Sequence, residues 1–488
     1  MERLSGLDST FLYLETPTQL LHVCGLIVLD VSTIPGGYDF DSFKAELTAR
    51  AQGMPVFRRK LHDSVLNLDH PVWVDDPEFD IDRHVHRIAV PGPGGRKELA
   101  DLCGHIAGQQ MDRTIPLWEM WVIEGSEDGT VAIMSKMHHA NVDGVTGASM
   151  MAQLCGLTPD APRPEVDPDQ RTAGDADTLD LAVSGLLGFV SRPLQLARAL
   201  PSGIALLPKW ITRARRGEAM PAPFTAPRTS LNGALTGHRN IAYAQLDLAK
   251  VKLVKDAFGV KVNDVVLAMV GGALRRYLSD RDELPDTSLV AMVPVSVHET
   301  SDRPGTNQIS GMFTQLGTQI GDPVTRLTEA NAHNTMVKSH NASLGASLLQ
   351  DWSQFAAPAA FGPAMRVYSS LKLAERHPVV HNLVVSNVPG PPVPLYLLGA
   401  RIVAMFPLGP IFHGAGLNAT VMSLDGRLNV GLMSCPELAP SCGTWPTPSG
   451  PPSTKWSRPP APRPASARPR LPGRDAHPAS AEAAGFAP

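Results

Sequence analysis

The sequence lacks the features that mark several common classes of protein. Only five of its 488 residues are cysteine, an odd number without a CxxC pair, which argues against both a disulfide framework and a zinc site. No uninterrupted apolar run reaches the roughly 18 residues that a membrane span needs, and the first residues show no secretory signal. The net charge of −4 gives no reason to expect nucleic acid as a partner. These absences predict a cytoplasmic protein, at most peripheral to the inner membrane face or to lipid droplets.

The residues that are present suit a large globular protein. A hydrophobic fraction of 43% and a charged fraction of 18% are enough for sizeable cores, and the length favours two domains. Strand-like and helix-like segments alternate through residues 1–155 and again through 237–440. Residues 156–236 begin as a polar linker and continue with helical periodicity, which indicates either a helical hairpin packed on the core or an interfacial helix. Residues 441–488, rich in Pro, Arg and Ala, are predicted to be a disordered tail.

Local patterns predict several individual elements. The apolar segments 23–29 and 131–134 are typical of strands, and residues 263–278 are typical of a helix. Residues 417–433 predict a β-hairpin, because Asp425-Gly426 is a favoured two-residue turn between two apolar segments.

The most informative segment is His138-His139-Ala140-Asn141-Val142-Asp143-Gly144, which has the pattern HHxxxDG. An apolar strand precedes it and a helical segment follows, so the histidines are expected at the end of a strand, where mixed folds often carry their chemistry. A neutral imidazole can accept the proton of an alcohol whose oxygen attacks an activated carbonyl. The residues alone do not choose between His138 and His139, and they leave a core or metal-binding role as an equal alternative. No His-x-x-x-His pair supports a metal site, so we expect none.

The HHxxxDG pattern resembles the signature of the CoA-dependent acyltransferase superfamily. Further segments, in this order, make the chain similar to the bacterial wax ester synthase/diacylglycerol acyltransferase family over roughly residues 1–438. They are Leu4-Ser5-Gly6-Leu7-Asp8-Ser9-Thr10-Phe11-Leu12-Tyr13-Leu14-Glu15, His22-Val23-Cys24-Gly25, Pro116-Leu117-Trp118, Thr229-Ser230-Leu231-Asn232-Gly233, Asn263-Asp264 and Ser386-Asn387-Val388-Pro389-Gly390-Pro391.

The resemblance implies a fold and an activity. The fold is a mixed α/β arrangement of two chloramphenicol-acetyltransferase-like domains joined by a helical linker. The activity is that of an acyl-CoA-dependent O-acyltransferase, which makes triacylglycerol from diacylglycerol or wax esters from long-chain alcohols. The implied partners are acyl-CoA and one of these acceptors, with peripheral contact to a membrane or lipid droplet. Acyl-CoA serves as a substrate, and no metal or redox cofactor is expected.

The resemblance also assigns roles within the HHxxxDG segment. His139 is the general base, and His138 shapes the site. Asp143 holds the geometry of the loop through a salt bridge, although it could equally cap the helix that follows. Gly144 allows a tight turn and gives acyl-CoA room.

Two other segments are predicted to contribute to the site. Asn263 could donate a hydrogen bond to the developing oxyanion, with helix capping as the alternative. Pro116, Leu117, Trp118 and Asp264 are predicted to lie beside the bound substrate, with packing in the core as the alternative.

Two other functions remain compatible with the sequence. A condensation domain of a peptide synthetase also carries HHxxxDG, but the Pro-Leu-Trp and Asn-Asp segments and the lack of a carrier domain count against it. A non-catalytic lipid-binding paralogue would keep the same motif without turnover. Enzyme assays distinguish both from an acyltransferase.

Overall fold

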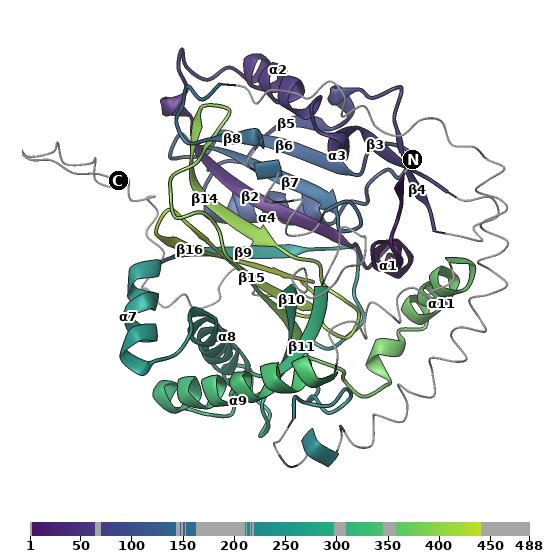
Figure 1. Ribbon diagram of the computed structural model, residues 1–488, viewed down its shortest axis with the longest axis vertical. Coiled ribbons are helices and arrows are strands. Elements are labelled where there is room, and N and C mark those ends of the chain that lie inside the picture. Colours follow the sequence, from purple (N-terminus) through teal and green to yellow (C-terminus); the bar gives the residue numbers. More distant parts are fainter. Residues whose placement is uncertain are drawn as a thin grey trace, which may run out of the picture. The chain divides into compact units, whose positions relative to one another are not determined.

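The computed structural model describes residues 2–63, 70–142, 147, 150–151, 153–162, 210, 212–214, 216, 219–296, 309–344 and 358–440. These residues form two mixed β-sheets with helices packed on them, and one small three-stranded sheet (Figure 1). The predicted α/β class is therefore confirmed. The periodic segment predicted as a linker helix falls largely within 163–209, and the predicted disordered tail is 441–488; both lie outside the described residues.

The first sheet has seven strands. In sheet order they are β5 (Val85–Ala89), β6 (Trp118–Glu124), β7 (Val131–His138), β2 (His22–Asp30), β14 (Ala400–Leu408), β13 (Tyr396–Leu397) and β8 (Cys155–Gly156). Only β5 and β6 are parallel, and the other neighbours are antiparallel. β2 and β7 contain the strands predicted at 23–29 and 131–134, which the structure confirms.

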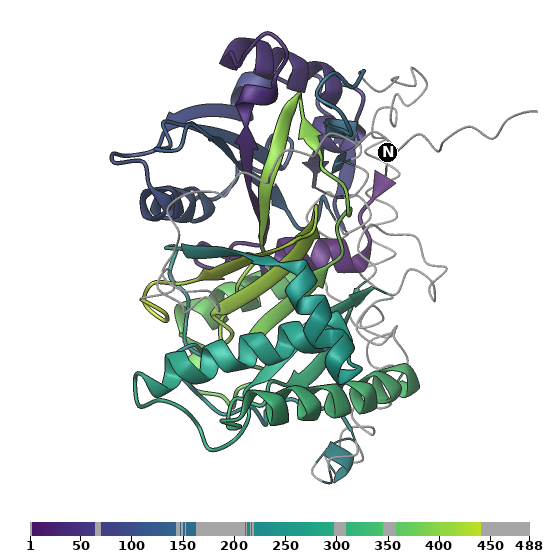
Figure 2. The same cartoon turned by 90° about the vertical axis from the view of Figure 1, so that its left-hand side faces the viewer.

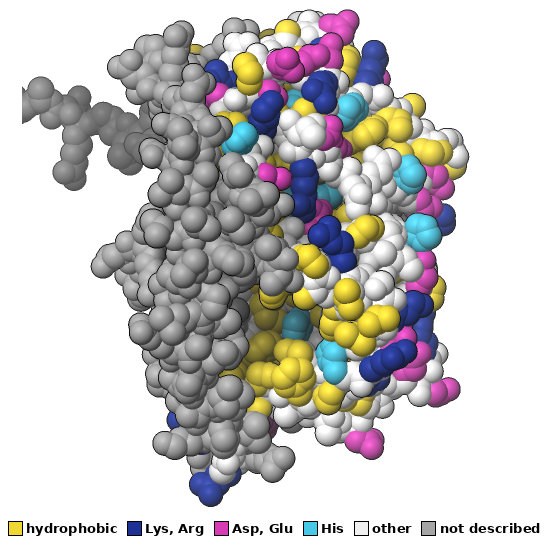
Figure 3. Space-filling model, turned by 90° about the vertical axis from the view of Figure 1, so that its right-hand side faces the viewer, with side chains coloured by type: hydrophobic (Ala, Val, Ile, Leu, Met, Phe, Trp, Pro, Cys, Tyr) yellow, Lys and Arg dark blue, Asp and Glu magenta, His cyan; other side chains and the backbone are white. Residues whose placement is uncertain are grey.

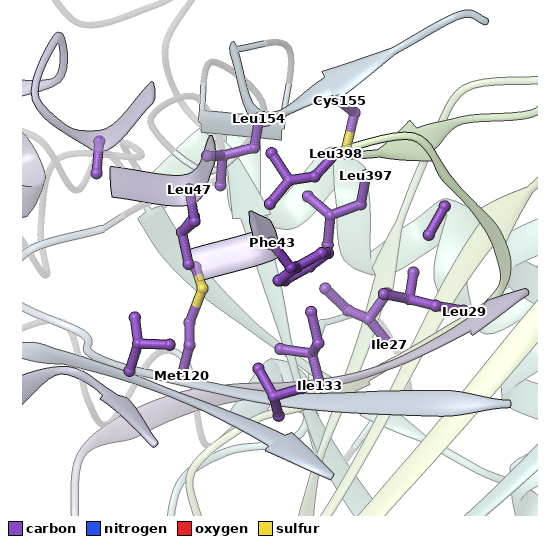
Figure 4. Close-up of a cluster of buried hydrophobic side chains, with 14 of the residues drawn as sticks. Ile27, Leu29, Phe43, Leu47, Met120, Ile133, Leu154, Cys155, Leu397 and Leu398 are labelled. Carbon is purple, nitrogen blue, oxygen red and sulfur yellow. The ribbon is translucent and has the colours of Figure 1, made fainter. Parts of the chain in front are cut away.

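One face of the first sheet is covered by the amphipathic helix α2 (Phe40–Ala51). Its Phe43 and Leu47 lie four residues apart and therefore point to the same side of the helix. Figure 4 shows them over Ile27, Leu29 and Ile133 of the two central strands. All five side chains are buried, and burying each contributes about 1.5–3 kcal/mol relative to leaving it exposed. This apolar layer packs α2 against the two central strands, β2 and β7.

The second sheet has six strands. In sheet order they are β11 (Ile309–Gln315), β10 (Val290–Ser296), β12 (Leu383–Val388), β15 (Leu417–Leu424), β16 (Arg427–Ser434) and β9 (Asn240–Asp247). The pair β15–β16 is the predicted hairpin. Asp425 and Gly426 both have positive φ, 44° and 74°, as a type I′ turn requires.

Three helices belong to the second sheet: α7 (Leu248–Phe258), α8 (Val262–Ser279) and α9 (Pro323–Leu344). α8 and α9 lie against each other below the sheet (Figures 1 and 2). Among the described residues, no single helix is long and apolar enough to span a membrane. Only α7 and α8 taken together have the necessary length and composition, and they are bent by 104° relative to each other.

The remaining elements flank the two sheets. The helices are α1 (Gly6–Leu14), α3 (Pro55–Arg58), α4 (Arg96–Ala107) and α11 (Pro358–Ser370), and 3-10 turns lie at Val31–Thr33, Ile81–Arg83 and Leu373–Glu375. The small sheet has the order β1 (Glu2–Arg3), β4 (Val72–Asp75), β3 (Arg59–His62).

The two large sheets are linked by β14, which comes late in the sequence but pairs with β2 in the first sheet. β14 also passes close to the second sheet: a Cβ atom on Gly431 of β16 would lie 1.9 Å from the carbonyl oxygen of Pro407. Only glycine permits this approach. The residues of the two sheets are therefore not separated by a single boundary in the sequence, because β14 belongs to the first sheet but lies, in the sequence, between strands of the second.

Candidate functional site

The two histidines of the HHxxxDG segment lie at the end of β7, as the sequence predicted. His138 is the last residue of the strand and pairs with His22 of β2. The backbone N–H of His138 donates to the carbonyl of Leu117 at 3.1 Å, and that of His139 donates to the carbonyl of Leu21 at 2.9 Å. The main chain under both side chains is therefore fixed by neighbouring strands.

His138 has a polar neighbour at each ring nitrogen. Its Nδ1 accepts a hydrogen bond from the backbone N–H of Ala140 at 3.1 Å, so a neutral ring carries its proton on Nε2. That Nε2 lies 3.3 Å from a carboxylate oxygen of Glu15, and the side chain is 1% exposed. A ring in this position can orient its surroundings, but it has no nitrogen left to receive a proton from a substrate.

Glu15, the residue that ends α1, is the centre of a charged cluster whose two histidines are buried and whose Arg113 is exposed. Its Oε1 lies 3.1 Å from Nε2 of His22, and its Oε2 contacts both His138 and the guanidinium of Arg113. Burial opposes ionisation of this carboxyl, but the contacts with His138 and His22 and the charge of Arg113 hold the pKa of Glu15 well below its usual range. Burial lowers the pKa of His22 to about 4, although Glu15 opposes this shift. At neutral pH the cluster therefore contains an ionised Glu15 and a neutral His22.

His139 lies in a different environment. Its side chain is half-buried, and its ring stacks on Phe11 of α1 with 3.9 Å between the ring centroids and 13° between the planes. Phe11 and Glu15 are four residues apart, so one face of α1 contacts both histidines. The stacking covers one face of the ring, and Nδ1 of His139 is buried.

The Pro116-Leu117-Trp118 segment is buried beneath the histidines. Leu117 is 0% exposed and supplies the carbonyl that binds the His138 backbone. The indole N–H of Trp118 donates to the carbonyl of Phe57 at 2.8 Å, and its ring stacks on His84 at 4.5 Å. These contacts favour packing as the role of Trp118.

Asn263 and Asp264 lie in the first turn of α8. A carboxylate oxygen of Asp264 accepts from the backbone N–H of Lys261 at 3.0 Å, so Asp264, not Asn263, caps the helix. The other oxygen accepts from Asn334 at 2.9 Å, and Asn334 accepts from Thr314 at 2.6 Å. Asp264 is thus occupied by the fold, while Asn263 is half-buried.

Asn232, from another segment of the resemblance, is part of a neutral buried cluster. Its amide donates to the carbonyl of Gly414 at 2.8 Å, and its oxygen accepts from Asn382 at 2.9 Å. Asn382 also accepts from the backbone N–H of Val290 and donates to the carbonyl of Pro227. This amide cluster, Asn232 with Asn382, ties three loops to the second sheet.

The sequence predicts no role for Glu15, His22, Phe11 or Arg113, although the first three stand in segments that carry the resemblance. The signal for them was the spacing of Phe11 and Glu15 on one helix face. Their contact with β7 depends on the pairing of distant strands, which a single sequence does not show.

The loop of the motif contains one further anchor that the sequence did not indicate. Asn141 is 0% exposed, donates to the carbonyl of Val56 at 3.0 Å and accepts from Arg59 at 3.3 Å. Asp143 and Gly144 lie outside the described residues. Within the described ranges, no group of three or more His, Cys, Asp and Glu side chains is arranged to hold a metal ion.

Comparison with solved structures first identifies the fold. The first condensation domain of the calcium-dependent antibiotic synthetase matches with a TM-score of 0.51 and 14% identity, covering 89% of this chain and 91% of that one. The wax ester synthase/diacylglycerol acyltransferase of Marinobacter aquaeolei VT8 matches with a TM-score of 0.64 and 29% identity, covering 90% of this chain and 95% of that one. The fold is therefore that of the HHxxxDG acyltransferases and condensation domains.

Comparison of sequences then identifies the family. The profile of the wax ester synthase/diacylglycerol acyltransferase catalytic domain matches residues 4–266, and that of the C-terminal domain of the same family matches residues 305–444. A Mycobacterium tuberculosis H37Rv protein named as a diacylglycerol O-acyltransferase is 54% identical over 441 residues, 90% of this chain and 87% of that protein. A second such protein of the same strain is 37% identical over 450 residues, 90% of this chain and 95% of the other. The chain belongs to the wax ester synthase/diacylglycerol acyltransferase family.

Proposed function

We propose that this protein transfers an acyl group from acyl-CoA to the free hydroxyl of diacylglycerol, releasing triacylglycerol and CoA. The observation that carries the proposal is the placement of His139, half-buried at the end of β7 with its ring stacked on Phe11. Relatives named as diacylglycerol O-acyltransferases, which match about nine-tenths of the chain, support the choice of substrates.

In the proposed reaction, His139 accepts the proton of the acceptor hydroxyl while that oxygen attacks the thioester carbonyl. The resulting tetrahedral intermediate collapses by breaking its carbon–sulfur bond, and the protonated imidazole returns the proton to the leaving thiolate. The proton taken from the hydroxyl is thus returned to the thiolate, so no net proton is consumed, and no metal or redox cofactor takes part. His138, whose Nδ1 accepts from the backbone of Ala140 and whose Nε2 lies beside Glu15, orients the loop and does not transfer the proton.

Other predicted residues take supporting roles in this proposal. Asn263, half-buried in the first turn of α8, donates to the oxyanion of the intermediate. Gly144 provides room for acyl-CoA, and Asp143 holds the loop. Pro116, Leu117, Trp118 and Asp264 act through packing around the site.

We further propose that the acceptor reaches the enzyme from a lipid surface bound at α11. This helix packs on α1, which contacts both histidines. Hydrophobic side chains gather on the face that carries α11 (Figure 3), and Val367 and Leu371 are each 54% exposed. Basic Arg366, Lys372 and Arg376 stand near them in the sequence and suit anionic head groups, with Glu375 as the one acidic residue in residues 358–376.

The lipid-surface proposal is tested by flotation with vesicles that contain diacylglycerol and an anionic phospholipid. Val367→Ser with Leu371→Ser should reduce vesicle binding and the use of diacylglycerol, while CoA release with a short soluble alcohol is kept. Leu253→Ser is the matched control, because Leu253 is 68% exposed on α7. Equal losses in both variants would contradict α11 as the docking surface.

The enzymatic proposal is tested by measuring CoA release from palmitoyl-CoA by purified protein with diacylglycerol, with hexadecanol and without acceptor. Release that depends on diacylglycerol and is abolished by His139→Ala supports the proposal. Greater release with hexadecanol would make the protein a wax ester synthase. No acceptor-dependent release by folded wild type would identify a non-catalytic lipid-binding member of the family.

A further inference from the structure

We propose that Glu15 is a positioning residue for the acyl transfer: it holds the two motif histidines in their working arrangement through His138. This inference rests on the proposed function of His139. It assigns a role to a residue that touches neither the reacting hydroxyl nor the thioester.

Three nitrogen-bearing side chains converge on the Glu15 carboxylate within ion-pair distance. Nε2 of His22, Nε2 of His138 and the guanidinium of Arg113 all approach the two oxygens of Glu15. The Glu15 side chain is 9% exposed, and those of His22 and His138 are 2% and 1% exposed. Water therefore offers little replacement for the contacts with the two imidazoles, whereas the Arg113 side chain is 44% exposed. The buried carboxylate restrains where the His138 ring lies.

The His138 ring is linked to His139 through the backbone. Because Nδ1 of His138 accepts from the backbone N–H of Ala140, the ring spans the residue between them, which is His139. Glu15 restrains the other nitrogen of that ring. Any rotation of the His138 ring would therefore break the short hydrogen-bonded turn that carries the proposed base.

The contacts to both motif histidines come from the same helix, α1. Phe11 stacks on the His139 ring, and Glu15, one helical turn later, contacts the His138 ring. The anchoring of Glu15 therefore also fixes the end of the helix that supports His139. Both motif histidines depend on one helix terminus.

A glutamine at position 15 would be nearly the same size but could not replace the carboxylate. It has one acceptor oxygen for three donors, and its amide group would face a ring N–H or the guanidinium. The charge of Arg113 would also lose its neutralising partner. The His138 ring is then expected to change position while the fold is retained.

The test compares steady-state kinetics of wild type and Glu15→Gln with palmitoyl-CoA and diacylglycerol. We expect kcat to fall about 10²-fold, as for a misplacement of a catalytic group by about 1 Å. The KM for palmitoyl-CoA should stay within about 3-fold, because the contact does not involve the substrate. Glu15→Asp, which keeps the charge, should recover part of kcat.

The matched control is Glu119→Gln in β6. Glu119 is also a partly buried carboxylate of this half, and it lies 3.3 Å from the buried Nζ of Lys136. Its loss should lower the thermal midpoint with little change in kcat of the folded enzyme. An equal fall in kcat in this control would show that Glu15 acts only through stability, and would overturn the proposal.

A second comparison uses His22→Gln, alone and combined with Glu15→Gln. His22 shares the Glu15 carboxylate with His138, and its ring also meets the His138 ring edge-on with 5.9 Å between the centroids. The losses of kcat in the two single variants should therefore not add in the double variant. Additive losses, or a large rise in KM with kcat unchanged, would overturn the proposal. If Glu15→Gln does not fold, Glu15→Asp provides the same separation of kcat from KM.

An activity-independent readout separates this proposal from the proposed function. In protein labelled with nitrogen-15 at histidine, the ring of His138, assigned with His138→Gln, should show the tautomer protonated at Nε2. Glu15→Gln should change that ring's nitrogen shifts, and Glu119→Gln should not. Wild type that lacks acyl transfer yet shows this dependence would reject the proposed function alone, while an unchanged His138 ring would reject the positioning role.

Discussion

Each half of the molecule buries a polar cluster beside its sheet, and the two clusters differ in charge. In the first half, the Glu15 carboxylate is surrounded by two imidazoles and a guanidinium. In the second, the amides of Asn232 and Asn382 satisfy each other and nearby backbone groups. Amides hold loops in the same way at every pH, whereas a carboxylate among imidazoles depends on protonation and on exact placement. We therefore expect the charged cluster to affect catalysis and the neutral cluster to affect the stability of the fold.

The largest expected effect is a loss of catalysis in the first half, where the charged cluster lies. His139→Gln should lower kcat by about 10²–10⁴-fold, the usual contribution of a general base, with little change in stability because the side chain is half-buried. Stopped-time assays of CoA release and a thermal melt measure the two quantities. A variant that keeps more than a tenth of wild-type kcat would contradict the role of His139.

Asn382→Ala should produce the opposite pattern. It removes the partners of Val290 N–H, Pro227 carbonyl and Asn232, all in a buried region, so the free energy of unfolding should fall by about 3 kcal/mol. The kcat of the folded fraction should be unchanged. Denaturant unfolding and assays at low temperature check both expectations, and a selective loss of kcat would contradict an architectural role.

Of the side chains that form the two clusters, those of the charged cluster titrate with acid, whereas the amides of Asn232 and Asn382 do not. Burial also lowers the pKa of His381 and of His413 in the second half to about 4. The pKa of His22 is about 4 in the folded protein and about 6.5 in an unfolded chain, so the unfolded state binds the proton first as the pH falls. The stability that comes from neutral His22 is thus complete above about pH 6.5 and is lost toward pH 4. Glu15, whose folded pKa is lowered, adds a loss only below its ordinary range.

Because the pKa of His22 is lowered in the folded state, its contribution to stability should differ measurably between neutral and acidic pH. Between pH 7.5 and pH 5, the advantage of wild type over His22→Gln in free energy of unfolding should shrink by on the order of 2 kcal/mol. The advantage of wild type over Asn382→Ala should change less over the same range, because both proteins keep the buried His381 and the amide itself does not titrate. Denaturant unfolding at several pH values measures both differences, and parallel curves for His22→Gln would contradict the assignment of a neutral buried histidine.

The smallest expected effect concerns the ring that supports the base. Phe11→Leu keeps an apolar side chain but removes the stacking on His139. Aromatic pairs contribute about 0.5–1.5 kcal/mol beyond burial, so kcat should fall by a few-fold. Phe43→Leu in the core under α2 is the control, because it should alter stability without changing kcat. A loss of kcat above about 10²-fold in Phe11→Leu would assign Phe11 a larger role than support.

The features that the sequence predicted correctly are those whose physical cause is local. The Asp425-Gly426 turn requires positive φ at two neighbouring residues, so the dipeptide itself indicates the hairpin. The apolar run before His138 makes a strand, and the motif follows at its end. The order of motifs was enough to indicate the family, which the profiles confirm.

The features that the sequence did not predict depend on distant contacts. The contact between Glu15 and His138 exists because β2 and β7 pair and α1 folds against them. Helix capping in α8 falls to Asp264, one residue after the residue expected to cap, because the helix begins at Val262. The burial of Trp118 between Phe57 and His84 also depends on neighbours more than 30 residues away.

The position of β14 has a consequence for the order in which this chain can fold during synthesis. β2 lies between β7 and β14, and its second neighbour consists of residues 400–408. Until the ribosome has delivered those residues, the strand that begins with His22 has an unpaired edge, which can pair wrongly with other strands. Translation of the first 162 residues therefore cannot complete the sheet that carries the histidines, and the nascent chain must keep that edge protected over more than half of its length.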